Sequence, residues 1–299
     1  MTKAPWPRQE RSGWKRSVRE NRTIEPPIES ERSYSVADLE ENAVGDYNPI
    51  PPEDRRVRVL DVFCGPGGVG VALREVFSQP NMAGAFAGID STDYGETYPG
   101  RFYQMDATTL SLDSLGLSEK ADLVWLSPPC RAYSPLSHVH HENPKEVYPT
   151  IPELGVRQLA KELGRHYVIE NVPACDDLDD SRTVSVNGAP FDHQLNYRRK
   201  FEVSFFGEFY AERYEGDQRQ REGIVPTGTA NRSALAEAKH IPEAAEWTEQ
   251  EARSAIPPQY VAFVLSHCPS LPEVAPPGGV EDYYGVTREP GQPTLFSFD

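Results

Sequence analysis

The sequence predicts an α/β protein with a doubly wound, mostly parallel β-sheet. The first observation is an apolar strand at residues 56–63, which leads into a glycine-rich turn and then an apolar helix at residues 69–77. The second is a set of later strand-like segments that each end in polar residues. Ligands of open α/β sheets bind beyond the carboxyl ends of the strands, so this pattern predicts a site at that edge.

The later strand ends follow one another in chain order. Residues 85–89 end in Asp90, and a third element ends in Gln104-Met-Asp106. Residues 122–126 end at two prolines and a cysteine, and residues 166–172 contain an acid and an amide. The strands therefore bring one polar group after another to the same edge of the sheet.

The stretch "WLSPPCRAYS" places Cys130 directly after Pro128 and Pro129. Proline cannot continue a central strand, because it donates no backbone hydrogen bond and its φ angle is fixed. Cys130 is therefore expected on a stiff loop beyond the strand, where a thiol can act as a nucleophile. The alternative is a small buried residue, since free cysteine is among the most buried residue types.

The glycine-rich turn predicts a nucleotide-type cradle. Glycine lets backbone N–H groups approach a ligand, and the N-terminus of the following helix faces it. Asp90 lies about 22 residues beyond the turn, where an acid can bind ribose hydroxyls. A nicotinamide dinucleotide is the rival ligand. It is disfavoured because Gly65-Pro-Gly-Gly68 lacks the G-x-G-x-x-G spacing and because Cys130 and Glu170 would have no role.

Composition narrows the class of protein. The formal net charge is -16, from 46 acidic and 30 basic residues. Acidic, lysine-poor sequences suit high intracellular salt, so we expect a halophilic source; the alternative is an acidic protein from a GC-rich genome. Four cysteines without metal-ligand spacing favour a reducing, cytoplasmic setting, and no apolar run is long enough for a signal peptide or a membrane span.

Five regions are expected along the chain. They are a disordered arginine-rich arm (1–55), a catalytic core (56–206), a small insert (207–247), a closing helix (248–268) and a flexible Pro/Gly-rich tail (269–299). Within the arm, residues 1–23 hold seven basic residues against two acidic ones. The arm could grip a nucleic acid electrostatically, or be a solvated leader without a role.

Three motifs in order resemble the DNA (cytosine-5) methyltransferases, in their compact phage-type or haloarchaeal branch. They are Asp61-Val-Phe-Cys-Gly-Pro-Gly-Gly68, Pro128-Pro-Cys130 with Ser134, and Glu170-Asn-Val172. Later segments of the compact type are matched by Gly188-Ala-Pro-Phe191, Arg198-Arg-Lys-Phe-Glu202 and Ala255-Ile-Pro-Pro-Gln-Tyr260. The resemblance covers roughly residues 56–268. It implies a Rossmann-like fold that binds S-adenosyl-L-methionine, with a small recognition insert.

The resemblance also implies catalytic roles. Cys130 would add to C6 of cytosine, Glu170 would pair with the N3 edge, and Asn171 would brace the Pro128–Pro129 backbone. Arg199 would touch the base or support the nucleophile. The alternatives are that Glu170 and Asn171 cap a sheet edge and that Arg199 lies on a solvated strand.

The cofactor residues follow from the same resemblance. Asp90 would bind the ribose hydroxyls and Asp106 the adenine amino group, although Asp106 could also be an ordinary strand exit. The other residues expected to line the cofactor are Phe63, Gly65, Gly67, Gly68 and Pro128. No metal is expected. The expected partner is double-stranded DNA with a flipped cytosine, bound by a monomer. The alternatives are an enzyme acting on RNA and a catalytically degenerate relative that only binds DNA or cofactor.

The chain departs from the family's pattern at several positions. Arg131 stands where glutamine is usual, and its charge would lower the pKa of the neighbouring thiol. Leu195-Asn-Tyr-Arg198 lacks the expected Gln-x-Arg pattern before Arg199. The short insert contains arginines suited to phosphate or guanine contacts, which are Arg213, Arg219, Arg221 and Arg232. His138, His140 and His141 are interpreted as part of a mobile loop, with metal binding as the alternative.

The tail ends in Gln292-Pro-Thr-Leu-Phe-Ser-Phe-Asp299. The pattern from Gln292 to Phe298 resembles the peptide that archaeal and eukaryotic proteins dock on the sliding clamp. A helical turn would place Leu295 and Phe298 together in an apolar pocket. The alternatives are that the tail folds back on its own domain or has no role.

Overall fold

A computed structural model describes residues 57–79, 82, 84–188, 195–205, 226, 230–271 and 274. The predicted arm at residues 1–55 and the clamp-like peptide Gln292–Phe298 lie outside the described residues, as do Arg213, Arg219 and Arg221. The expectations for them therefore stay predictions.

The core is a seven-stranded sheet with the order β3-β2-β1-β4-β5-β7-β6, and it confirms the predicted doubly wound, mostly parallel α/β fold. Within the described residues, β7 alone runs opposite to the other strands, because it pairs antiparallel with both β5 and β6. The strands are β1 (Val57–Val62), β2 (Gly84–Asp90), β3 (Arg101–Gln104), β4 (Ala121–Leu126), β5 (Gly164–Asn171), β6 (Thr183–Val186) and β7 (Arg199–Val203).

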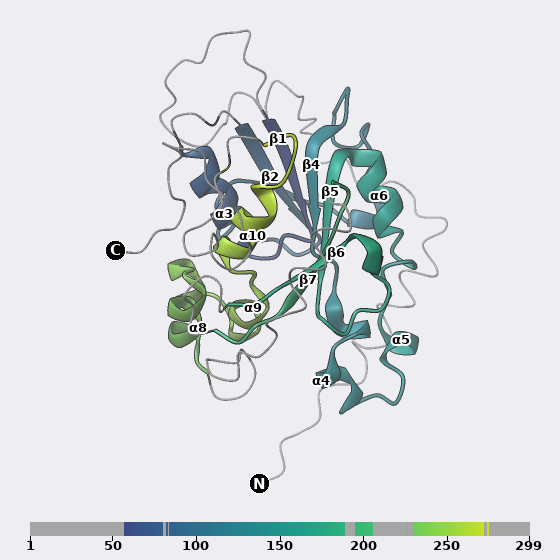
Figure 1. Cartoon of the computed structure of the whole chain (residues 1–299), viewed down its shortest axis with the longest axis vertical. Helices are drawn as coiled ribbons and strands as arrows, with labels where there is room; N and C mark the ends of the chain where they lie inside the picture. Colours follow the sequence, from purple (N-terminus) through teal and green to yellow (C-terminus); the bar gives the residue numbers. More distant parts are fainter. Residues whose placement is uncertain are drawn as a thin grey trace.

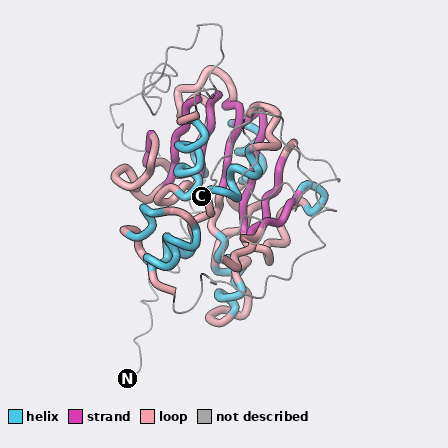
Figure 2. The backbone as a smooth tube through the Cα atoms, turned by 60° about the vertical axis from the view of Figure 1, so that its left-hand side comes forward, coloured by secondary structure: helices cyan, strands magenta, loops and turns pink. Residues whose placement is uncertain are grey.

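Helices cover both faces of the sheet (Figures 1 and 2). The helices of the described residues are α3 (Gly68–Phe77), α4 (Pro135–His138), α5 (Pro144–Val147), α6 (Val156–Leu163), α8 (Arg232–Lys239), α9 (Glu249–Ser254) and α10 (Pro258–Leu265). Helices α3 and α10 cover one face and α6 the other. Val59 of β1 packs in the cluster formed with α3 and α10, whereas Leu60 packs in the cluster formed with α6. Neighbouring residues of one strand thus enter two separate cores, and this explains why the central strands β1, β2 and β4 are mostly apolar and almost wholly buried.

The strand register places the carboxyl ends of the central strands together. Val62 lies beside Ile89 of β2 and Leu126 of β4, and Leu126 lies beside Ile169 of β5. The residues that follow these positions in the chain therefore emerge at one edge of the sheet. The predicted site residues Gly65, Asp90 and Cys130 are among them.

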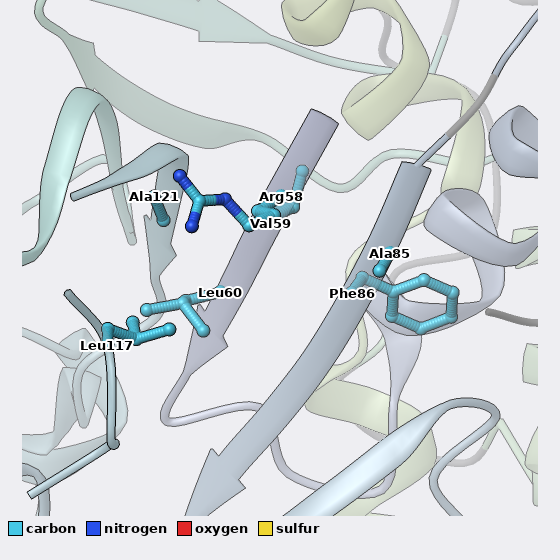
Figure 3. A pocket seen from close by; sticks show the side chains of 7 residues that line it. All are labelled: Arg58, Val59, Leu60, Ala85, Phe86, Leu117 and Ala121. Carbon is cyan, nitrogen blue, oxygen red and sulfur yellow. The ribbon is translucent and has the colours of Figure 1, made fainter. Parts of the chain in front are cut away.

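A small cavity lies at the opposite edge of the sheet (Figure 3). Its lining comes from the amino-terminal halves of β1, β2 and β4 and from a preceding loop, and the residues are Arg58, Val59, Leu60, Ala85, Phe86, Leu117 and Ala121. Its volume is about 10 Å³. A cavity of that size holds at most one water molecule, so it is a packing defect rather than a ligand site.

The segment 248–268, which was expected to be one closing helix, contains two helices. A break at residues 255–257 separates α9 from α10, and α10 packs against α3. Residues 231–247, expected in the recognition insert, form α8 and the short 3-10 helix Pro242–Ala245. These pack on Val71 of α3 through a third apolar cluster that includes Leu235 and Trp247. The helical part of the insert is therefore fixed to the catalytic core.

The described helices are too short or too polar to cross a membrane.

A buried ion pair ties α6 to β7. Arg157 donates from Nε to Glu202 Oε1 at 2.7 Å and from Nη2 to Oε2 at 2.6 Å, while Glu202 is 1% exposed. The Asp179 backbone N–H also donates to Glu202 Oε2, and the Arg157 guanidinium donates to the Asp177 carbonyl. The pair thus fixes the loop after β5 as well as the helix.

Replacing Arg157 with methionine is expected to lower the free energy of unfolding by about 3 kcal/mol, because it leaves the Glu202 carboxylate buried without a cation. The measurement is urea unfolding of the folded chain. Arg165→Met is the matched control, because it removes a half-exposed arginine that pairs closely with exposed Glu119, at 2.7 Å, and only at 3.8 Å with the buried Asp122. An exposed pair of this type is worth about 1 kcal/mol or less. Equal losses in the two variants would contradict this assignment.

Candidate functional site

The glycine-rich turn after β1 has a backbone that ordinary residues avoid. Gly65 and Gly67 have φ angles of 53° and 114°, and Phe63, which was predicted to line the cofactor, also has a positive φ of 58°. The Gly65 N–H donates to Asp90 Oδ2 at 3.0 Å, and the Thr92 N–H donates to Asp90 Oδ1 at 2.9 Å. Asp90 therefore fixes the turn to the end of β2. Its carboxylate oxygens still have further lone pairs for a ligand.

The three glycines of the turn have different surroundings. A Cβ on Gly67 would lie 2.4 Å from Pro99 Cδ, and one on Gly68 would lie 3.0 Å from the Ile256 nitrogen. Both glycines are therefore required by close packing. Beside Gly65, a Cβ would meet nothing within 4 Å, so the strained turn faces open space at this point. Helix α3 begins here without an acidic residue in its first turn, and its N-terminal N–H groups favour a negatively charged or polar ligand.

Asp106 lies at the end of β3 and caps the short 3-10 helix Ala107–Thr109. Its Oδ1 accepts from the backbone N–H and the hydroxyl of Thr108 at 2.9 and 2.8 Å. This is a local structural role, as the strand-exit alternative expects. The assignment of Asp106 to the adenine amino group stays a prediction, and Oδ2 is the oxygen that would serve it.

Cys130 begins a short 3-10 helix, Cys130–Ala132, directly beyond β4. Its carbonyl accepts from the backbone N–H groups of Tyr133 and Ser134, so the loop folds tightly behind the thiol. Burial raises the pKa of the thiol, the Arg199 charge lowers it, and the Glu170 charge raises it. The half-buried thiol thus lies within the electrostatic reach of two further predicted site residues.

Glu170 and Arg199 form a buried ion pair between β5 and β7. Arg199 Nε lies 3.0 Å from Glu170 Oε1, and the side chains are 11% and 8% exposed. Burial raises the pKa of Glu170 to about 7, although the Arg199 charge and a hydrogen bond from Ser127 lower it. Trp125 donates to the Ser127 hydroxyl oxygen and so leaves the hydroxyl proton for Glu170. A carboxyl with this pKa exchanges a proton near neutral pH.

Asn171 is hydrogen-bonded to the backbone of the proline–cysteine loop. Its Nδ2 donates to the Pro128 carbonyl at 3.2 Å, and its Oδ1 accepts from the Val172 backbone N–H at 2.9 Å. This is the contact that the resemblance predicts for it. Pro128 is itself buried, so it takes part in this brace. Its predicted contact with the cofactor stays a prediction.

Two further residues at this site carry no signal in the sequence motifs. They are Tyr197 and Lys239. The Arg199 guanidinium carbon lies 3.9 Å from the centroid of the Tyr197 ring, and Lys239 Nζ lies 4.0 Å from the same centroid. Arg199 also donates to the Tyr197 hydroxyl, which in turn donates to the Ser254 carbonyl at 2.8 Å. In the sequence, Tyr197 is only part of the stretch that lacks the expected Gln-x-Arg pattern, and Lys239 lies in a helix of ordinary polar composition. Neither residue was therefore predicted to belong to the site.

A buried acid also lies just before the turn. Asp61 Oδ2 accepts a hydrogen bond from the Tyr98 hydroxyl at 3.1 Å, and burial raises the pKa of Asp61 well above its ordinary value. The Tyr98 ring fills a slot where a Cβ on Gly70 or Gly88 would come within 3 Å of it. Asp61 therefore ties β1 to the loop after β2, whose Tyr98 ring packs against Gly70 of α3.

The expected effect of Arg131 on the Cys130 pKa is present but small beside other effects. Its charge lowers the pKa of Cys130, but Arg199 has the larger effect and burial outweighs both. The Arg131 guanidinium lies over the Tyr148 ring instead, 5.8 Å from its centroid. In the same region, His141 Nε2 lies 3.2 Å from the Tyr148 hydroxyl. Among the residues that the structure describes, no group of three or more His, Cys, Asp or Glu could hold a metal ion.

Comparisons with known proteins give distant structural matches. No protein-family model matches the chain, and no curated protein matches its sequence. A putative DNA modification methyltransferase encoded within a prophage of E. coli matches with 14% identity and a TM-score of 0.36, over 60% of this chain and 54% of that chain. The S. pombe Dnmt2 methyltransferase (18%) and the Entamoeba histolytica methyltransferase EhMeth (17%) also match with TM-scores of 0.36, each over 60% of this chain and 62% of that chain. The chain thus spans 54 to 62% of these three structures, and its function is argued below from the site.

Proposed function

We propose that the protein transfers a methyl group from S-adenosyl-L-methionine to carbon 5 of cytosine in DNA, through a covalent bond between Cys130 and carbon 6. The observation that carries the proposal is the meeting of three groups at one edge of the sheet. They are a half-buried thiol, a buried carboxyl with a pKa of about 7 and an arginine that ion-pairs with that carboxyl. Cytosine needs both a nucleophile at carbon 6 and a proton donor at N3.

Cys130 supplies the nucleophile. As a thiolate, its Sγ forms a bond to carbon 6, the electron pair of the C5–C6 double bond forms a C4–C5 double bond, and the former C4–N3 π pair takes up a proton at N3. The resulting enamine makes carbon 5 nucleophilic. The stiff backbone of Pro128 and Pro129, held by Asn171, fixes the direction of attack. When the C5 proton later leaves to a base, the bond between sulfur and C6 breaks and the double bond re-forms. The thiolate is regenerated in the last step.

Glu170 supplies and recovers the proton. Its protonated carboxyl donates to N3 as the thiolate attacks, and N3 returns the proton when sulfur leaves. A well-placed general acid of this kind contributes roughly 10²–10⁴-fold. Arg199 lies beside Glu170 and holds it in position, and its charge also favours the thiolate form of Cys130.

The residues of the glycine turn fit the cofactor. The open space beside Gly65 and the uncapped start of α3 form a cradle next to Asp90, whose carboxylate suits two ribose hydroxyls. Phe63 would line the methionine or ribose, and Asp106 and Pro128 would complete the set. When bound, the cofactor supplies a methyl group on a positively charged sulfur, an electrophile for the carbon 5 that Cys130 makes nucleophilic.

The proposed partner is double-stranded DNA with the target cytosine turned out of the helix, because the catalytic edge cannot reach carbon 6 of a stacked base. The proposal includes three predictions about contacts of the chain. The arm at residues 1–23 and the insert arginines would contact the DNA, and Gln292–Phe298 would dock on a sliding clamp. A monomer suffices for this reaction, since the described residues of one chain include both the predicted catalytic residues and the predicted cofactor-binding residues.

The proposal predicts that the full chain, incubated with methyl-labelled S-adenosylmethionine and unmethylated duplex DNA, places label in 5-methyl-2′-deoxycytidine. The measurement is mass spectrometry of nucleosides after complete digestion. The reaction is run from low to molar potassium chloride, because a halophilic protein with net charge -16 would need salt to fold. A parallel arm contains transfer RNA.

Label in RNA cytidine alone would replace DNA by RNA as the substrate. No labelled cytidine in either arm, from protein that is folded and binds the cofactor, would contradict the proposed function.

A further inference from the structure

Among the described residues, Lys239 is the one lysine that is buried, and it lies against the candidate site. Its side chain is 0% exposed, although lysine is almost never fully buried without partners. Nζ donates to three carbonyls at the end of α9, those of Ala252, Arg253 and Ala255, at 2.9, 2.7 and 2.7 Å. Three acceptors match the three N–H bonds of an ammonium group.

These contacts alone would make Lys239 a cap for α9. Its fourth contact extends the link to the site. Nζ lies 4.0 Å from the centroid of the Tyr197 ring, within the range of a cation–π interaction. The same ring contacts the Arg199 guanidinium carbon at 3.9 Å, and its hydroxyl accepts from Arg199. Arg199 in turn pairs with Glu170.

We propose that Lys239 is a positioning residue that holds the Tyr197 ring, and through it Arg199, beside Glu170 and Cys130. The kinetic part of this proposal rests on the proposed methyl transfer. Its chemical part concerns only the ionisation of Cys130 and is independent of any substrate.

The charges around Glu170 agree with such a link. The groups that affect the pKa of Glu170 are Arg199 from β7, Ser127 after β4 and Lys239 from α8, and each of them lowers it. Arg199 also lowers the pKa of Cys130. Burial and Arg199 lower the pKa of Lys239, whereas the three carbonyls and the ring face fit its charged form. Loss of Lys239 would therefore shift the pKa values of Glu170 and Cys130 upward.

The test uses Lys239→Met, which keeps most of the side-chain volume and removes the charge and the three hydrogen bonds. The first readout is alkylation of Cys130 by iodoacetamide as a function of pH, followed by peptide mass spectrometry, so that the three other thiols do not interfere. We expect the alkylation profile to move to higher pH and the rate at pH 8 to fall severalfold. If the wild type transfers methyl groups, we also expect kcat to fall about 10- to 100-fold with unchanged cofactor affinity.

Thr248→Ala is the matched control. Thr248 caps the other end of α9 by accepting from the Glu251 N–H, and its removal loosens the same helix without a contact to Tyr197. We expect it to lower thermal stability and leave both the Cys130 profile and kcat unchanged. Tyr197→Phe serves as a second variant, because it removes only the hydroxyl between Arg199 and Ser254, and it should shift the Cys130 profile in the same direction as Lys239→Met.

Each outcome bears on a different proposal. A wild-type Cys130 profile in both Lys239→Met and Tyr197→Phe would overturn the positioning role, whatever the activity. A shifted profile in a chain that methylates neither DNA nor RNA would support the positioning role and contradict the proposed function. If Lys239→Met does not fold, Lys239→Gln, which removes the charge but can still donate to the α9 carbonyls, takes its place, because Tyr197→Phe leaves the contact between Lys239 and the ring intact.

Discussion

Replacing Cys130 with alanine is expected to abolish methyl transfer while S-adenosylmethionine still binds. Without the thiol no bond to carbon 6 forms, and removal of a covalent nucleophile lowers kcat by ~10⁴-fold or more. The most direct measurement uses duplex DNA that contains 5-fluorocytosine. Fluorine cannot leave C5 as a proton does, so the wild type should remain covalently attached to this DNA. The alanine variant should form no such complex, although its cofactor affinity by calorimetry matches the wild type.

Cys268→Ala is the control for this prediction, because it removes a buried thiol at the end of α10 whose pKa burial raises to about 11. It should trap fluorinated DNA as the wild type does. Covalent attachment by the Cys130→Ala variant, or attachment mapped to another cysteine in the wild type, would exclude Cys130 as the nucleophile.

Replacing Glu170 with glutamine is expected to lower kcat/KM by roughly 10²–10⁴-fold and to change the shape of its pH profile. The reactive enzyme holds one proton between the two groups, as a thiolate at Cys130 and a neutral carboxyl at Glu170. Below the Glu170 pKa of about 7 both groups are protonated, so wild-type activity should rise as pH increases through about 7. Above the raised pKa of the Cys130 thiol, the one proton that the two groups share is also lost. The reactive form with a protonated Glu170 then disappears, and activity should fall again.

Glutamine cannot titrate, so the rise near pH 7 should be absent in the variant. Its residual activity should instead increase with pH as Cys130 ionises. The measurement is single-turnover methyl transfer as a function of pH, over a range that extends on both sides of the Glu170 pKa of about 7. A variant that keeps the rise near pH 7 would assign that limb to another group.

The fold was predictable because strand and helix periods are local properties of the sequence. The run from residue 57 to 62 is apolar because the strand is covered on both faces, and the glycines that follow permit a turn that other residues avoid. The contact between Asn171 and the Pro128 carbonyl agrees with the role that the resemblance implies for Asn171. In contrast, the expectation of one helix at residues 248–268 was wrong although the sequence carried the signal, because Pro257 and Pro258 cannot continue a helix interior and α10 begins at Pro258.

The supporting residues of the site were not predictable in the same way. Lys239 lies in the stretch Arg232–Lys239, whose pattern is typical of an exposed helix end, and its burial results from packing against α9 and Tyr197. For a related reason, the sequence did not indicate that Arg131 would affect the Cys130 pKa less than Arg199 does. Its position next to Cys130 in the chain says little about where the guanidinium points, and Arg199, distant in sequence, has the larger effect.

The packing of α10 against α3 has a consequence for how the chain folds during synthesis. The seven strands of the sheet have all been synthesised once Val203 has been added. One face of the sheet is then covered by α3 alone, because Phe263 and its neighbours on α10 have not yet been synthesised. These follow about 60 residues later, which takes several seconds at translation rates of ~5–20 residues per second. During that interval the nascent protein exposes apolar surface on a nearly finished sheet. We expect ribosome-bound chains stalled before α10 to be sensitive to protease and to bind chaperones that hold unfolded segments.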